Sequence, residues 1–222
     1  MQQRLVLFDL DNTLVDRQRT LNAALARFAI RHGLGDDGRL KLVSRFAARA
    51  TPSDFAEIRD SYRLTVGQEQ LWLEYLADMA ALSRCPVEVL DGLDELRAEG
   101  WSVAVATNGS ADIQWAKLRA AGIAHRVDAV CISEECGARK PHPRHFARAA
   151  ERCGARIDRG GWMVGDHPIH DIAGGHAAGL KTVWIGDMAR WPAQLAPPAH
   201  AVTSARHAID LILHQAETRR NP

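Results

Sequence analysis

The amino-acid sequence predicts an α/β fold in which a doubly wound, mainly parallel sheet carries a helical segment inserted after its first strand. Short apolar runs rich in β-branched residues alternate with amphipathic stretches of helical length over most of the chain. This alternation is typical of a parallel sheet covered by helices. Residues 17–83 depart from it, because they show helical periodicity and no convincing strand.

The expected strands are short and almost wholly apolar, as strands buried on both faces of a sheet are. In chain order they are residues 5–8, 103–106, 129–132, 162–164, 182–185 and a weaker run at 201–203. The helices expected between the later strands are residues 89–99, 113–121, 143–153 and 172–179. Residues 187–199 contain several prolines and are expected to form an irregular surface loop.

The inserted stretch shows four helical faces, each marked by apolar residues three or four positions apart. These residues are Leu21, Leu25 and Phe28; Leu42, Val43 and Phe46; Phe55, Ile58 and Tyr62; and Leu71, Trp72, Tyr75 and Met79. Gly33 and Gly35 separate the first two helices, Thr51-Pro52-Ser53-Asp54 caps the third, and Gly67 precedes the fourth. The sequence therefore predicts a small helical bundle.

The aromatic residues of this bundle are expected to pack in its core rather than to line a ligand site. We therefore expect two domains. Residues 1–14 and 85–222 would form an α/β catalytic core, and residues 15–84 would form a helical cap.

Composition and charge exclude several classes of protein. Hydrophobic residues make up 46% of the chain and charged residues 25%, so the chain is not expected to be disordered. A net charge of +1 provides no field that would attract nucleic acid or an anionic membrane, and neither is expected as a partner. Four cysteines are few for a secreted disulfide scaffold, and no apolar run resembles a leader or a membrane span. A cytoplasmic location is therefore expected.

Asp9 and Asp11 follow the first expected strand at the edge where a parallel sheet opens its binding crevice. Taken alone, the pair could be a polar turn. A calcium loop is excluded, because Thr13 and Leu14 stand where that loop needs an Asp or Asn and a glycine. Carboxylates this close repel each other unless a cation holds them, which predicts a hard divalent metal such as Mg²⁺.

Two further polar clusters follow the second and third strands. Thr107, Asn108 and Gly109 provide a hydroxyl, an amide and a permissive glycine, which suit an anion. Lys140 follows the third strand and could supply a point charge for phosphate. Each cluster by itself is also common loop chemistry.

A fourth cluster restores the acidic count that a metal site needs. Gly165 and Asp166 end the fourth strand, and Asp171 follows five residues later. Since four polar clusters follow four successive strands in the same order, we expect them to meet in one crevice. The pairs His142 and His145, and His167 and His170, have spacings that suggest zinc, but no cysteine accompanies them in the sequence, and they are expected to line or flank the crevice.

With these clusters the sequence resembles the haloacid dehalogenase-like (HAD) superfamily of hydrolases over essentially the whole chain. The four motifs of that superfamily are matched by Asp9-Leu10-Asp11-Asn12-Thr13, by Thr107-Asn108, by Lys140-Pro141, and by Gly165-Asp166 with Asp171. The insertion resembles the cap that follows the first motif in the phosphoglycolate phosphatase-like and nucleotidase-like branches. The resemblance implies a HAD-like Rossmannoid core, a nucleophile and a metal, but no particular substrate.

The resemblance also implies roles for individual residues. Asp9 would be the nucleophile that forms an aspartyl-phosphate, and Asp11 would protonate the leaving oxygen and then activate water. Mg²⁺ would be held by the Asp9 carboxylate, the Asp11 main-chain carbonyl and Asp166, with Asp171 acting through water or by orienting Lys140. The phosphoryl oxygens would be bound by Thr107, Asn108, Gly109 and Lys140.

Asp11 favours phosphate chemistry, because the haloalkanoate dehalogenases of the superfamily lack the second aspartate. The expected function is therefore Mg²⁺-dependent hydrolysis of a small phosphorylated metabolite. Two alternatives share the motifs, namely a sugar phosphomutase and a phosphate-binding regulatory protein without turnover. All the expected catalytic residue types are present, which places the regulatory protein last. No motif in the cap identifies a substrate, and no feature of the sequence indicates an oligomeric state.

Overall fold

The α/β core is built on a parallel sheet of six strands in the order β3-β2-β1-β4-β5-β6. The structure is a computed structural model that describes residues 3–48 and 50–218, so the terminal parts of the predicted core and one residue of the predicted cap lie outside it. The strands are β1 (Leu5–Phe8), β2 (Ser102–Thr107), β3 (Ala129–Ile132), β4 (Trp162–Gly165), β5 (Lys181–Ile185) and β6 (His200–Val202). The predicted fold class is confirmed.

The central strand β1 lies where the order of the strands reverses. It pairs with β2 on one side and with β4 on the other, so Phe8 is in register with both Val105 and Val164. The chain proceeds outward from β1 through β2 to β3 and then returns to β4 on the opposite side of β1. In open parallel sheets such a reversal opens a crevice beyond the carboxyl ends of the strands.

Side chains of alternate strand residues enter two different apolar clusters, one on each face of the sheet. On one face Val6, Phe8 and their neighbours pack against α5 (Val87–Ala98) and α10 (Ala205–Thr218). On the other face Leu5, Leu7 and their neighbours pack against α8 (Pro143–Arg152). Alternate residues of a strand point to opposite faces, and both faces are covered by apolar side chains. Most positions of a strand are therefore apolar, which is why the strands appear in the sequence as continuous apolar runs.

The remaining elements of the core connect these layers. They are α6 (Ala111–Ala120), α7 (Ser133–Cys136), α9 (Gly174–Ala177), two 3₁₀ turns at Ile157–Arg159 and Met188–Arg190, and a π-helix at Pro168–Ala173. Helices α7 and α10 were not predicted, and the predicted helix over residues 172–179 is instead the end of the π-helix followed by α9. No helix in the described part of the chain is both long enough and apolar enough to span a membrane.

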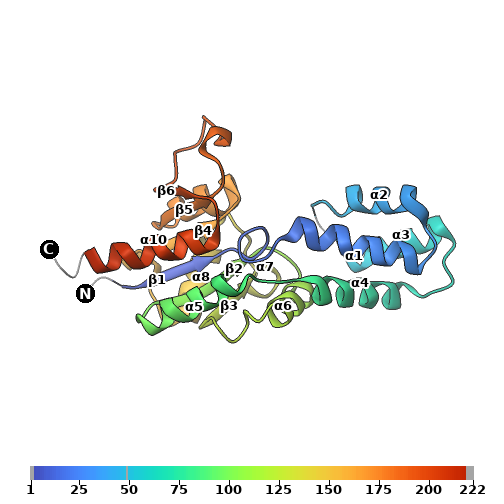
Figure 1. Cartoon of the computed structure of the whole chain (residues 1–222), viewed down its shortest axis with the longest axis horizontal. Coiled ribbons are helices and arrows are strands. Elements are labelled where there is room, and N and C mark those ends of the chain that lie inside the picture. Colours follow the sequence, from blue (N-terminus) through green and yellow to red (C-terminus); the bar gives the residue numbers. More distant parts are fainter. Residues whose placement is uncertain (1–2, 49, 219–222) are drawn as a thin grey trace.

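Four helices between β1 and α5 form a separate bundle at one end of the molecule (Figure 1). They are α1 (Arg17–Arg31), α2 (Gly35–Arg45), α3 (Pro52–Tyr62) and α4 (Gln68–Leu82). A capping box of Thr51 and Asp54 begins α3, and Gly67 is the N-cap of α4, as predicted. Helix α2 differs slightly, because it begins at Gly35, which was expected to lie between helices.

The bundle has its own aromatic core. The ring of Phe55 lies between 5.4 and 5.8 Å from the rings of Phe28, Phe46, Trp72 and Tyr75. These five side chains are buried, as predicted for aromatic residues that pack rather than bind a ligand. Tyr62, also predicted to pack there, is half-buried at the margin of the bundle.

The bundle rests on the core mainly through helix α6. Helix α4 packs along α6, and the Trp72 indole N–H donates a hydrogen bond of 3.0 Å to the Asp112 carboxylate. Ile113, in the first turn of α6, belongs to the apolar cluster of the bundle. Thus one helix of the core carries the contact with the inserted helices.

The central position of Phe55 generates a stability prediction. Replacing it by alanine (Phe55→Ala) should lower the free energy of unfolding by about 3 to 5 kcal/mol, because a cavity opens among four rings. Urea denaturation followed by tryptophan fluorescence measures this loss. Ile30→Ala, at a side chain that is 82% exposed on α1, is the matched control and should change stability by less than about 0.5 kcal/mol. Equal losses in the two variants would contradict the assigned core.

Candidate active site

The four polar clusters meet at the carboxyl edge of the sheet around β1. Asp9 directly follows β1, and its main-chain N–H donates a hydrogen bond of 2.9 Å to the Val164 carbonyl of β4. Thr107 is the last residue of β2, Asp166 follows β4, and Lys140 lies in the loop between α7 and α8. The expectation that these residues share one crevice is therefore met by their positions.

A buried lysine lies between two aspartates at the centre of this crevice. The Lys140 ammonium is 2.5 Å from Asp9 Oδ1 and 2.7 Å from Asp171 Oδ1. Asp9, Lys140 and Asp171 are only 7%, 2% and 1% exposed. Carboxylate oxygens of Asp9, Asp166 and Asp171 all lie within 4.8 Å of one another. Three carboxylates thus share one nearby ammonium, which leaves an excess of negative charge.

This crowding changes the pKa values of the cluster. Burial, helped by Asp171 and Asp166 and opposed by Lys140, raises the pKa of Asp9 to about 8. Burial and the Asp171 charge raise the pKa of Asp166 to about 6. Burial lowers the pKa of Lys140, but Asp171 and Asp9 outweigh it, so the pKa lies above its ordinary value. A further cation would let all three carboxylates ionise together, and a set of oxygen ligands fits a hard divalent metal.

Local geometry places Asp171 against the end of β4. A Cβ atom added at Gly165 would lie 2.4 Å from Asp171 Cγ, so only glycine allows this approach. The π-helix carries Asp171 toward the crevice, and the His167 main-chain N–H donates a hydrogen bond of 3.0 Å to Asp171 Oδ2. The carboxylate is therefore held from one side by a backbone N–H and from the other by Lys140.

Asn108 fixes the loop that carries Lys140. Its side-chain N–H donates to the Lys140 carbonyl at 3.1 Å, and its side-chain oxygen accepts from the Lys140 main-chain N–H at 2.9 Å. The main-chain N–H of Gly109 donates to Ser133 Oγ at 3.0 Å. These hydrogen bonds connect the end of β2 to the segment after β3. In that segment, the peptide bond between Lys140 and Pro141 is cis.

Asp11 lies near this cluster but its side chain joins a different one. Its carboxylate is 2.7 Å from the Lys117 ammonium and 3.2 Å from the Gln114 side-chain nitrogen. The Gln114 side chain also donates to Thr107 Oγ1 at 2.6 Å. Lys117 and Gln114 come from α6 and were not predicted as site residues. The sequence does contain a signal for these two residues. Lysines are few in this chain, and Lys117 lies one helical turn after Gln114 on the helix that follows Thr107.

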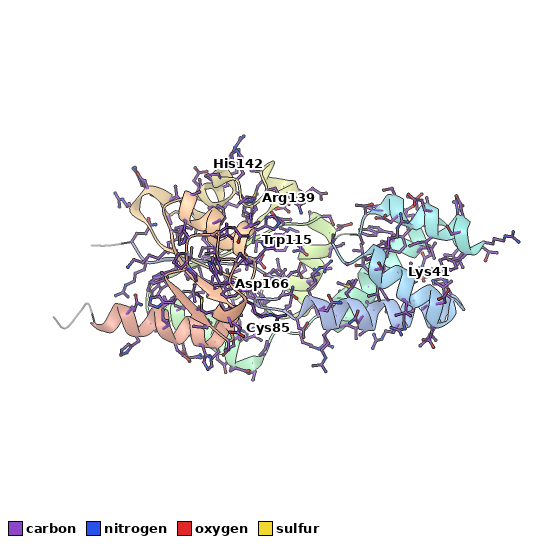
Figure 2. The ribbon with its side chains drawn as sticks, turned by 90° about the horizontal axis from the view of Figure 1, so that it is seen from above. Lys41, Cys85, Trp115, Arg139, His142 and Asp166 are labelled. Carbon is purple, nitrogen blue, oxygen red and sulfur yellow. A yellow bond between two sulfur atoms is a disulfide. The ribbon has the colours of Figure 1, made fainter. Side chains whose placement is uncertain are left out.

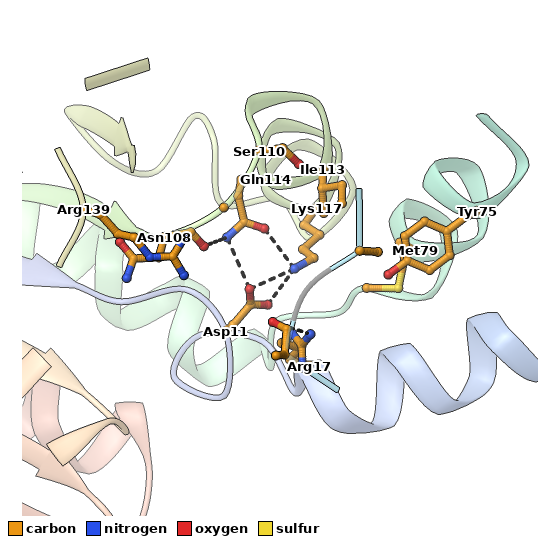
Figure 3. A pocket seen from close by; sticks show the side chains of 13 residues that line it. Asp11, Arg17, Tyr75, Met79, Asn108, Ser110, Ile113, Gln114, Lys117 and Arg139 are labelled. Carbon is orange, nitrogen blue, oxygen red and sulfur yellow. Dashed lines mark hydrogen bonds and ion pairs between the residues drawn. The ribbon is translucent and has the colours of Figure 1, made fainter. Parts of the chain in front are cut away.

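A cavity of about 60 Å³ lies beside Asp11, between the inserted helices and the core. Figure 3 shows Asp11, Gln114 and Lys117 on one side of it and Tyr75 and Met79 of α4 on the other. The remaining lining residues come from both parts of the chain and are Arg17, Ala48, Ala50, Asn108, Gly109, Ser110, Ile113 and Arg139.

Among the residues that the structure describes, neither histidine pair lies together in a group of three or more possible metal ligands. His167 Nδ1 accepts hydrogen bonds from the main-chain N–H groups of Ile169 and His170, and His142 lies at the outer edge of the core (Figure 2). From the sequence, no cysteine was expected beside these histidines, and this expectation is wrong for His145. A nitrogen of its ring lies within 4.8 Å of the sulfur atoms of Cys131 and Cys136, which are joined by a disulfide. Burial lowers the pKa of His145 to about 4.

Comparison with known proteins places this arrangement in context. Residues 6–185 match the family described as haloacid dehalogenase-like hydrolase. The chain is 42% identical over 93 residues to phosphoserine phosphatase of Thermus thermophilus, which covers 42% of this chain and 37% of the relative. It is 33% identical over 162 residues to ribulose-1,5-bisphosphate 5-phosphatase of Halopiger xanaduensis, which covers 72% of this chain and 62% of the relative. The chain thus spans less than two thirds of the length of either curated relative.

The fold is also similar to that of solved structures. The crystal structure of a HAD phosphatase from Thermococcus onnurineus superposes with a TM-score of 0.67 and 22% sequence identity. The superposition covers 95% of this chain and 98% of that one.

The raised pKa values of Asp9 and Asp166 generate a prediction for the metal-free protein. A carboxyl group whose pKa is higher in the folded than in the unfolded state stabilises the fold at low pH, and this contribution is lost as the pH rises through the folded pKa. The free energy of unfolding in chelator should therefore fall as the pH rises from 4 to 8, across the window set by ordinary carboxyl values and the value of about 8 for Asp9.

Denaturation curves at intervals of pH, with chelator or with saturating Mg²⁺, measure this dependence. Asp9→Asn should flatten the chelator curve, whereas Asp36→Asn, at an exposed carboxyl of α2, should leave it unchanged. A chelator curve that rises between pH 5 and pH 8 would contradict the assigned electrostatics.

The close contact at Gly165 generates a second prediction. Gly165→Ala should lower the free energy of unfolding by about 1 to 3 kcal/mol, because the added methyl group overlaps Asp171. Gly67→Ala is the control, since a Cβ there meets nothing within 4 Å and its φ of −67° suits alanine, so only the preference for glycine at the N-cap of α4 is lost. Thermal unfolding measures both changes, and a neutral Gly165→Ala would show that Asp171 is not held against β4.

Proposed function

Because this chain belongs to the haloacid dehalogenase-like hydrolase family, we propose that it hydrolyses a small phosphorylated metabolite in a Mg²⁺-dependent reaction. The observation that carries the proposal is the group of three carboxylates around one buried lysine at the strand reversal. The curated relatives named above are phosphatases of phosphoserine and of ribulose-1,5-bisphosphate, which supports a phosphoric monoester as substrate.

Mg²⁺ would be held by the carboxylates of Asp9 and Asp166 and the main-chain carbonyl of Asp11, with Asp171 beside them. When bound, it supplies the positive charge that allows an anionic nucleophile to approach an anionic phosphoryl group. Its charge also compensates the excess of carboxylates in the cluster, whose oxygen atoms lie within 4.8 Å of one another. The donor set is therefore suited to this ion.

Asp9 is the proposed nucleophile. A carboxylate oxygen attacks phosphorus in line, the bond from phosphorus to the leaving oxygen breaks, and an aspartyl-phosphate forms. Lys140 fixes the direction of the Asp9 carboxylate through its contact with Oδ1 and neutralises charge on the transferring group. Thr107, whose hydroxyl lies at the end of β2, and the segment at Asn108 and Gly109 would bind phosphoryl oxygens.

Asp11 is the proposed acid and base. It gives a proton to the leaving oxygen in the first step, and in the second it accepts a proton from the water that attacks phosphorus. This second attack breaks the bond between phosphorus and Asp9, releases inorganic phosphate and restores the Asp9 carboxylate. Its place beside the cavity, on the side opposite Tyr75, is compatible with both transfers.

We further propose that the two domains have different functions. The core of residues 1–14 and 85–222 would carry out the chemistry, and the cap of residues 15–84 would select the substrate. Arg17 and Tyr75 of the inserted helices line the cavity next to Asp11, so the cap contributes to its wall.

The test is a phosphate-release screen with sugar phosphates, nucleoside monophosphates, phosphoglycolate and phosphoserine. Turnover should require Mg²⁺, stop in chelator and return when Mg²⁺ is restored. Inorganic phosphate as the product distinguishes hydrolysis from transfer to a second sugar hydroxyl, which a phosphomutase would show. Full activity in chelator, or no release from any compound, would contradict the proposal.

The two aspartates of the first motif should respond differently to substitution. Asp9→Asn should reduce turnover to background, because no aspartyl-phosphate can form. Asp11→Asn should slow hydrolysis of an alkyl phosphate by roughly 10² to 10⁴, yet still form phosphoenzyme from p-nitrophenyl phosphate, whose leaving group needs no proton. Rapid quench and mass spectrometry of the peptide carrying Asp9 reveal the label. Label on another residue, or substantial activity of Asp9→Asn, would overturn the assignment.

A further inference from the structure

Two buried residues of α6 hold the side chain of Asp11, and the reaction proposed above gives neither of them a role. The Lys117 ammonium lies 2.7 and 2.9 Å from the two oxygens of the Asp11 carboxylate. Gln114 donates to the same carboxylate at 3.2 Å. Lys117 is 2% exposed and Gln114 is 1% exposed, although both border the cavity.

Gln114 connects this pair to the end of β2. Its side-chain oxygen accepts from the Lys117 ammonium at 2.9 Å, and its side-chain nitrogen donates to Thr107 Oγ1 at 2.6 Å as well as to Asp11. Both ends of the amide are therefore engaged, which fixes Lys117 relative to Thr107. Figure 3 shows the two side chains converging on Asp11 from α6.

Stability alone is a poor explanation for this arrangement. Removing an ammonium from water costs free energy that a single ion pair often fails to recover. The chain has four lysines, at positions 41, 117, 140 and 181. Two of them are buried, and each of these two forms an ion pair with one aspartate of the first motif. Lys140 contacts Asp9, and Lys117 contacts Asp11.

This pairing separates two carboxylates that belong to one short loop. Asp9 joins Asp166 and Asp171 in the group that could hold a cation, whereas the Asp11 side chain is not part of that group. Because Asp11 is only two residues from Asp9, a cation bound by this group would also attract the Asp11 carboxylate. A second positive charge elsewhere can hold the carboxylate away from that cation. Lys117 supplies that charge on the side of the cavity.

We propose that Lys117, supported by Gln114, is a positioning residue that directs the Asp11 carboxylate toward the cavity and away from the Asp9, Asp166 and Asp171 group. The inference rests on the proposed function, in which the Asp11 side chain exchanges protons with groups that bind in the cavity it lines. Helix α6 also bears the inserted helices through Asp112 and Ile113, so one helix aligns the acid with the wall of the substrate cavity.

The first test compares leaving groups in the Lys117→Met variant. Phosphoenzyme formation from an alkyl phosphate should slow by about 30-fold to 300-fold, because a misdirected Asp11 cannot supply the proton. Formation from p-nitrophenyl phosphate, followed by rapid quench, should slow by less than about fivefold. Equal losses with both leaving groups would overturn the proposal.

A double-variant cycle tests whether Lys117 acts through Asp11. In an Asp11→Asn background, adding Lys117→Met should change the alkyl phosphate rate by less than about threefold, because the residue it positions is already absent. Losses that multiply would show an independent role for Lys117. Gln114→Met, which keeps the lysine, should give a smaller loss of about 3-fold to 10-fold with the same leaving-group dependence.

Arg119→Met is the matched control, because Arg119 is an exposed cation on the same helix, stacked on Trp115. It should leave both rates unchanged. If Lys117→Met does not fold, Gln114→Met carries the comparison of leaving groups, and a loss that is equal for the two compounds overturns the proposal.

A crystal structure of Lys117→Met gives a readout that does not depend on turnover. The Asp11 carboxylate should leave its position beside the cavity, and an unchanged position would overturn the positioning role. If the unaltered protein releases no phosphate from any compound, the proposed function fails separately from this structural result.

Discussion

Lys140 buries its ammonium between Asp9 and Asp171, and much of the surrounding structure serves to keep it there. Asn108 binds both main-chain polar groups of Lys140, which ties the loop after α7 to the end of β2. Gly165 leaves room for the Asp171 carboxylate to reach the lysine. Three carboxylates and one ammonium occupy this crevice, so the repulsion between the carboxylates must be balanced by positive charge. This requirement links the positions of the residues in the group.

Helix α6 connects the inserted helices with the residues around Asp11. Helix α6 receives α4 through Asp112 and Ile113 at its first turn, and it presents Gln114 and Lys117 to Asp11 on the following turn. The inserted helices therefore rest on the helix that holds the second aspartate. Any displacement of α4 relative to the sheet would act on the cavity wall beside Asp11, since Tyr75 and Met79 of α4 form part of that wall.

Features that depend on neighbouring residues were determined by the sequence itself. The apolar runs predicted the strands, because most residues of β1 to β5 are apolar and buried between the helices on the two faces of the sheet, whereas the weaker run of β6 is half-buried. The capping box at Thr51 and Asp54 located the start of α3. The polar clusters after four strands predicted a shared crevice, because parallel strands all end at the same edge. Gly165 was assigned to the fourth polar cluster from sequence, and the structure shows that its lack of a side chain lets Asp171 approach the end of β4.

Features that join distant segments were decided only by the tertiary structure. Lys117 contacts Asp11 across 106 positions of sequence, and its place one turn after Gln114 does not by itself indicate that Asp11 is its partner. His145 lies beside Cys131 and Cys136 because α8 packs on β3, and helix α10 completes one face of the sheet from the far end of the chain. Phosphate binding at Asn108 stays a prediction, and the structure adds that the Asn108 side-chain amide binds the main chain of Lys140. In each case the partner is set by packing between elements, which the periodicity of a single segment does not encode.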